Sequence, residues 1–197
     1  MQKFLLLLVV LISCVIVTSA QEAKQEQPAK KGCSCSFSAI IQGGILHGSR
    51  GGYFQAQIIN GIRYKTWFAG LGAGLDFYYR PGIPLFVDIR KNILDNPGAL
   101  FLYVDAGVHL PVKRNEKINA WTQNEYSNSF YGDGGVGYAF GFHSKVHWVF
   151  STGYSYKEGS YKVINPGSGC TGPTCGELYY NYKKYFHRLT VKLGFQF

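Results

Sequence analysis

Charged residues are scarce in this sequence, and methionine is nearly absent. Asp, Glu, Lys and Arg together make up 16% of the 197 residues, and there is one Met. This composition does not fit a coiled coil, which is rich in Ala, Glu, Lys and Leu at heptad spacing. A disordered chain is excluded as well, because 16% of the residues are aromatic and disordered segments contain few aromatic side chains.

A second long hydrophobic run is also missing. The only one extends from Phe4 to Val17, behind Lys3 and ahead of the small residues Thr18 to Ala20. This pattern is typical of a secretory signal peptide. No later stretch supplies the ~20 consecutive apolar residues that a transmembrane helix needs. The exported chain is therefore expected to be either soluble or a closed β-barrel, since only helices and closed barrels satisfy all backbone hydrogen bonds in lipid.

The expected organisation has three parts. Residues 1–20 form the signal peptide, residues 21–32 a flexible periplasmic leader, and residues 33–197 a single folded domain. An alternative stays open for the first part, because the residues before Cys14 also fit a bacterial lipoprotein box, in which Cys14 would be lipidated. The apolar run that continues past Cys14 favours cleavage after Ala20.

From Ser36 onward, apolar and polar residues alternate with a period of two, which predicts β-strands. In the segment from Trp67 to Tyr79, for example, Leu71 lies on the apolar face, and Gly70 and Asp76 lie on the other. Six segments alternate clearly, and Ser36–Leu46 and Tyr53–Ile59 do so less cleanly. We therefore expect an all-β protein, an eight-stranded antiparallel up-and-down transmembrane β-barrel.

The expected connections differ between the two ends of the barrel. Three at one end are short, near Asn60–Lys65, Lys91–Gly98 and His143–Val146, whereas Pro111–Ser129 and Glu158–Lys183 at the other end are long and polar. Short periplasmic turns and longer outer loops are typical of outer-membrane barrels. The pattern predicts a location in the cell outer membrane.

The direction of the two strand faces follows from where the aromatic residues gather. Aromatic side chains lie on the apolar face near the strand ends, as in the interfacial girdles of membrane barrels. If the apolar face is turned outward to lipid, the ionisable residues of the other face lie in the lumen. We expect them to pair there as a structural network, with a proton path or a carboxylate site as the less favoured interpretation. The network residues are Asp76, Asp88, Arg90, Asp105, Asp133, Arg188 and Lys192.

Three segments carry a resemblance to a known family. They are Gly70–Tyr79, Ile83–Arg90 and the terminal Leu193–Phe197. In these segments the chain resembles the small outer-membrane β-barrel proteins of Bacteroidetes, which are similar in build to the OmpA and OmpX barrels. The closing Leu193, Phe195 and Phe197 resemble the signal that the barrel-assembly machinery reads. The resemblance implies insertion by that machinery and does not imply a reaction.

Four cysteines remain after the signal peptide. Cys170 and Cys175 lie in an expected outer loop that Gly and Pro can turn, so we predict a local disulfide between them. Cys33 and Cys35 are too close in sequence for an unstrained ring. For this second pair a redox role, two free thiols and a link to a partner chain all stay open.

Signatures of chemistry are few. No nucleophile elbow, P-loop, zinc-binding His-Glu motif or dinucleotide fingerprint is present, and we expect no catalytic residues, metal or cofactor. His109 and Asp105 share one strand face, and a packed lumen contact is the favoured interpretation of that pair over an acid–base dyad. The formal charge of +9, or +8 without Lys3, includes basic loop residues that can contact the phosphates of lipopolysaccharide. Nucleic acid is not an expected partner.

These observations favour a non-enzymatic, structural or accessory barrel of the outer membrane with a side-chain-filled lumen. Its outer loops would be the contact surface, and outer-membrane lipid and lipopolysaccharide its surroundings. One alternative is a subunit of a multi-protein envelope machine for secretion, assembly or uptake, with an envelope protein as partner. Another is a lipid-A-modifying enzyme.

Overall fold

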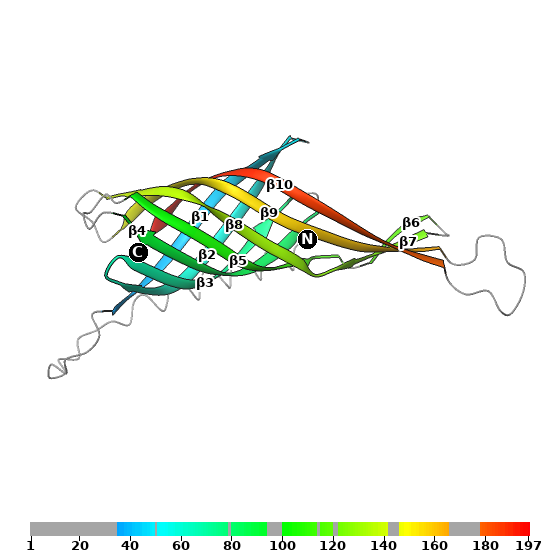
Figure 1. Cartoon of the computed structure of the whole chain (residues 1–197), viewed down its shortest axis with the longest axis horizontal. Coiled ribbons are helices and arrows are strands. Elements are labelled where there is room, and N and C mark those ends of the chain that lie inside the picture. The colour runs from blue at the N-terminus through cyan, green and yellow to red at the C-terminus, as the bar shows by residue number, and fades with distance from the viewer. Residues whose placement is uncertain are drawn as a thin grey trace, which may run out of the picture. The chain divides into compact units, whose positions relative to one another are not determined.

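The chain folds into a closed barrel of eight antiparallel strands, each hydrogen-bonded to its neighbours. The computed structural model describes residues 35–49, 51–78, 80–93, 100–113, 115–119, 122–141, 146–165 and 178–197. The barrel strands are β1 (Cys35–Gly48), β2 (Gly51–Tyr64), β3 (Trp67–Asp76), β4 (Gly82–Asn92), β5 (Leu100–Pro111), β8 (Ser129–Phe140), β9 (His147–Asn165) and β10 (Leu178–Gln196). The predicted eight-stranded antiparallel fold is confirmed (Figure 1).

The barrel closes where the last strand pairs with the first. β10 runs antiparallel to β1 from the pair Ile40 and Gln196 to the pair His47 and Leu189. On its other edge β10 pairs with β9 over its whole length. Among the described residues, no helix is long and apolar enough to cross a membrane.

Two strands continue past the barrel wall and form a small sheet with a hairpin that was expected to be a loop. β9 and β10 are 19 residues long each, or about 60 Å at ~3.3 Å per residue. Beyond β8, the strand β7 (Thr122–Ser127) pairs with β9, and β6 (Asn115–Asn119) pairs with β7 (Figure 1). The described parts of the two connections predicted as long loops are therefore largely β-structure.

The wall of the barrel is apolar outside and polar inside. Outward positions carry large aliphatic side chains such as Leu71, Val104 and Leu189, which are 60–70% exposed. The inward positions hold buried acids, bases, glutamines and serines. β1 and β2 alternate less cleanly than the other strands because three of their inward residues, Ile40, Leu46 and Ile59, are apolar as well.

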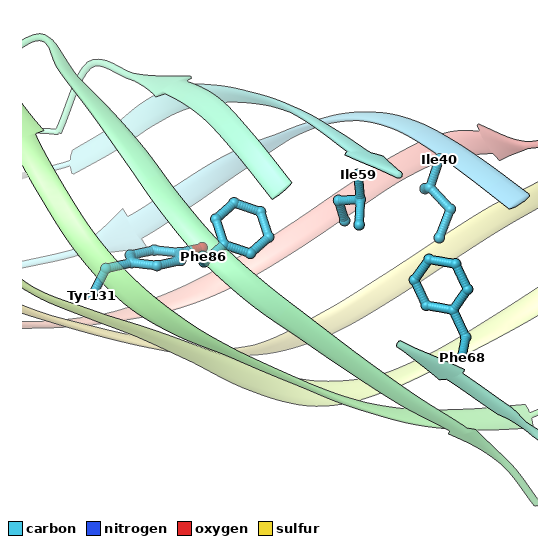
Figure 2. Close-up of a cluster of buried hydrophobic side chains, with 5 residues drawn as sticks. All are labelled: Ile40, Ile59, Phe68, Phe86 and Tyr131. Carbon is cyan, nitrogen blue, oxygen red and sulfur yellow. The ribbon is translucent and has the colours of Figure 1, made fainter. Parts of the chain in front are cut away.

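An apolar cluster fills part of the lumen. Its members come from five strands, and the rings of Phe86 and Tyr131 lie next to each other, tilted by 50° with centroids 5.4 Å apart (Figure 2). The cluster consists of Ile40, Ile59, Phe68, Phe86 and Tyr131. The sequence analysis described the lumen face as polar, rich in Gly and ionisable residues, and did not predict this cluster.

Inward glycines leave room for aromatic rings of neighbouring strands. A Cβ at Gly72 would lie 2.4 Å from the ring of Phe86, and one at Gly137 would lie 2.3 Å from the ring of Phe101. A side chain at either position would occupy the space of a buried ring. The glycines therefore determine how many large side chains the narrow lumen holds.

Candidate functional site

The candidate site is the network of charged side chains in the lumen. Its centre is a row of three carboxylates on adjacent strands. Asp88 of β4 lies opposite Asp105 of β5, which in turn lies opposite Asp133 of β8. All three side chains are buried. The strand register brings together acids that are 45 positions apart in the sequence.

A single lysine binds two of these carboxylates. Lys192 of β10 places its Nζ 3.0 Å from Asp133 and 3.5 Å from Asp105. Tyr103 donates a hydrogen bond of 2.9 Å to Asp133, and the Lys192 ammonium lies 4.6 Å from the Tyr103 ring centroid. Asp133 therefore has two partners at 3.0 Å or less, whereas the Lys192 contact of Asp105 is long.

The third carboxylate binds an arginine of its own strand. Arg90 donates from Nε and Nη2 to Asp88 at 2.9–3.0 Å, the forked geometry that guanidinium and carboxylate groups favour. Three rings surround this guanidinium at 5.3–6.0 Å, those of Phe68, Phe101 and Tyr103. The pair is thus held in an aromatic cage.

Uncharged polar side chains connect the two ion-pair groups. Arg90 donates to Gln42 at 3.5 Å, Gln42 donates to Gln57 at 2.7 Å, and Gln57 donates to Tyr131 at 2.9 Å. Tyr131 in turn donates to Asp133 at 3.5 Å. Sequence analysis missed these glutamines, although their inward positions in the alternating pattern are a signal that could have identified them.

A separate acid–base group lies toward the end of the barrel from which β9 and β10 project, which we call the mouth. Asp76, at the end of β3, forms an ion pair with Lys157 of β9. The Nε2 atom of His109 lies 3.4 Å from the other oxygen of Asp76. The acid next to His109 is therefore Asp76, not the Asp105 considered from the sequence.

Arg188 of β10 is also buried at the mouth, but no carboxylate of the described residues lies within 4.0 Å of it. Its guanidinium lies 3.7 Å from the ring centroid of Tyr78 and 4.6 Å from that of Tyr53. Nη1 donates to the backbone carbonyl of Gly51 at 3.1 Å. Arg188 therefore does not join the ion-pair network that the sequence assigned to it.

All seven residues expected in the network face the lumen, and none is more than 6% exposed. Five of them lie in the linked groups around Asp88 and Asp133. Asp76 instead pairs with Lys157, and Arg188 packs on tyrosine rings. The terminal Leu193, Phe195 and Phe197 face outward, with 37–53% of each residue exposed.

Part of the sequence-based interpretation lies outside the described residues. This applies to the signal peptide, the leader, and Cys14, Cys33, Cys170 and Cys175. Within the described ranges, no group of three or more His, Cys, Asp or Glu side chains is arranged to hold a metal ion. Comparison with protein-family models, with curated proteins and with solved structures found no match.

Proposed function

We propose that the chain is an integral β-barrel of the bacterial outer membrane with a structural or accessory role. The observation that carries this proposal is the polarity of the wall. A closed barrel in water fills its interior with apolar side chains, whereas this one buries Asp, Lys and Arg and exposes Leu, Ile, Val and Phe. Such an arrangement gains stability only where hydrocarbon surrounds the wall.

Aromatic rows near both ends of the wall support a membrane setting. Trp148 lies between Phe140 and Phe195 near one end, with ring centroids 6.4 and 4.2 Å away. Toward the mouth, Tyr156 lies near the rings of Tyr185 and His187. Aromatic side chains favour the two interfaces of a bilayer. The rows would mark the upper and lower limits of the apolar band.

The filled lumen supports a role other than a pore. Eight strands enclose a space just wide enough for side chains, and here ion pairs, glutamines and rings occupy it. Each buried carboxylate of the lumen, on Asp76, Asp88, Asp105 and Asp133, contacts a Lys or Arg side chain, which supports a structural use of these acids. The sheet of β6, β7 and the ends of β9 and β10 is the surface that would contact partners outside the cell.

The proposal is tested by expressing the full chain in a Gram-negative host and separating its membranes. We expect the protein in the outer-membrane fraction after alkaline carbonate extraction, with gel mobility that changes on boiling. A soluble, carbonate-extracted protein would contradict the membrane placement. Step conductance in planar bilayers would contradict the filled lumen, and an altered lipid A mass profile on deletion would favour the enzyme alternative.

A further inference from the structure

A notch interrupts the wall of the barrel at the mouth, between a short hairpin and a long strand. β1 pairs with β10 only as far as His47 and Leu189, and the chain then turns back between Gly48 and Gly51. β10 extends eleven residues further, to Leu178. A cavity of about 530 Å³ lies where the two separate, lined by Ser49, Tyr53, Tyr78 and the β10 residues Lys184 to Arg188.

Arg188 contributes the buried charge of this cavity. The side chain is 6% exposed, and its fit depends on Gly48, where a Cβ would come within 3.1 Å of the guanidinium Nε. The rings of Tyr53 and Tyr78 hold the guanidinium at 4.6 and 3.7 Å. A long, flexible cation is thereby fixed in one position beside the cavity.

The charge of Arg188 is not balanced by the described residues around it. Asp76, the acid at the mouth end of β3, is already bound to Lys157 and close to His109. A guanidinium carries five N–H donors, and the hydrogen bond recorded for Arg188 in the described part of the chain is the one to Gly51. Cation–π contacts stabilise the charge but do not satisfy N–H donors. An anion in the cavity would balance the charge of Arg188 and also accept hydrogen bonds from its N–H donors.

The cavity reaches both faces of the wall. Arg188 faces the lumen, whereas Tyr185 and His187, which also line the cavity, face outward and are exposed. The two belong to the aromatic row around Tyr156. In the membrane placement proposed above, this row lies at the level of the lipid headgroups, so a group held by an outer-leaflet lipid can enter the notch from the side.

We infer that the notch binds a phosphate group of an outer-leaflet lipid headgroup. The fork of the Arg188 guanidinium matches two oxygens of a phosphate, and the tyrosine rings offer an apolar surface to the attached sugar or glycerol. This inference rests on the proposed function, because a headgroup reaches the notch only if the barrel lies in a membrane. The same chemistry would accept a free phosphate ester, which the experiment separates.

The test uses the full folded barrel in a neutral, phosphate-free detergent, with binding measured by calorimetry. The probes are diphosphorylated lipid A, the same lipid after phosphate removal, and glucosamine 1-phosphate as the soluble source. The variants are Arg188→Gln and Arg188→Lys. Lys91→Gln is the matched control, because Lys91 contacts Thr66 and the Trp67 ring far from the notch in the strand register. Each variant must keep the heat-dependent gel shift of the folded barrel.

We expect Arg188→Gln to weaken binding of diphosphorylated lipid A at least tenfold, Arg188→Lys to weaken it less, and Lys91→Gln to leave it within twofold. Because Arg188→Gln can fail to fold, Ser49→Glu provides a second variant that leaves Arg188 in place. A glutamate at the cavity rim would supply the missing carboxylate, and we expect it also to weaken binding at least tenfold.

Three outcomes would overturn the inference. They are unchanged affinity in both Arg188→Gln and Ser49→Glu, equal affinity for the dephosphorylated lipid, and binding of glucosamine 1-phosphate without binding of the lipid. The membrane placement is tested separately, by fractionation of the unmodified chain. A negative result there is therefore distinguishable from a negative result in the lipid A binding experiment.

Discussion

The ring of Phe101 on β5 occupies the space that a side chain at Gly137 on β8 would need. An ideal Cβ at Gly137 would lie 2.3 Å from the ring Cζ. Phe101 is 3% exposed and packs beside Arg90 and Tyr103, so the ring has little room to move. Through this contact, the backbone of β8 supports the aromatic cage around the Arg90–Asp88 ion pair of β4.

We therefore expect Gly137→Ala to destabilise the barrel by about 1–3 kcal/mol, the usual cost of overpacking a filled interior. Gly134→Ala is the control on the same strand, because a Cβ there faces outward and meets its first atom at 3.5 Å. The measurement is urea unfolding of both variants in lipid vesicles. Equal stability of the two would show that the lumen is not packed around this glycine.

The polarity of the wall makes a second prediction. Leu71 faces outward near the middle of β3 and is 70% exposed. In lipid, Leu71→Arg should cost about 2–4 kcal/mol, because a cation at the bilayer midplane is poorly solvated. Ile93→Arg is the control, since Ile93 lies just beyond the end of β4, where the cost falls to about 0–1 kcal/mol. Unfolding in vesicles measures both, and a neutral Leu71→Arg would contradict a membrane location for the wall.

The alternation of apolar and polar residues was enough to predict the fold, because in a strand it fixes which side chains face inward. A shift of one residue would turn Asp76 out of the lumen and Leu71 into it. It also predicted that the seven charged residues lie on one face. It did not predict their partners. Pairing depends on the register between strands, and the contacts of Lys192 with Asp105 and Asp133 join residues that are 87 and 59 positions apart, respectively.

Other features were missed for physical reasons. The hairpin of β6 and β7 is polar, so its strands lack the apolar alternation that marks the barrel wall. Phe86 and Phe101 lie at inward positions that the pattern assigned to polar residues, and only the facing glycines make those positions possible. Arg188 was grouped with the acids by charge, but in the barrel two tyrosines hold it at the mouth.

Removing the shared lysine should be the most damaging single change in the network. In Lys192→Met, the carboxylates of Asp105 and Asp133 lose their common cation while staying buried. Breaking a buried ion pair in this way typically costs about 3–5 kcal/mol. We expect loss of the heat-dependent gel shift or a large drop in the urea midpoint. Combining Lys192→Met with Asp133→Asn should recover part of the loss, because one of the two orphaned charges is then removed.

The two acids bound by Lys192 should respond differently to neutralisation. Asp133 accepts from Tyr103 at 2.9 Å and from Tyr131 at 3.5 Å in addition to its 3.0 Å contact with Lys192. Asp105 has the 3.5 Å contact with Lys192, and its Oδ1 has no hydrogen-bond partner among the described residues.

Asp133→Asn should therefore cost about 2–3 kcal/mol of unfolding free energy through the loss of charge-assisted hydrogen bonds. Asp105→Asn should be neutral or stabilising, because it removes a buried charge that shares its cation and lets the new amide donate to Asp88 across the strand pair. Urea unfolding of the two variants in vesicles gives the comparison, and a larger loss in Asp105→Asn than in Asp133→Asn would contradict this assignment of partners.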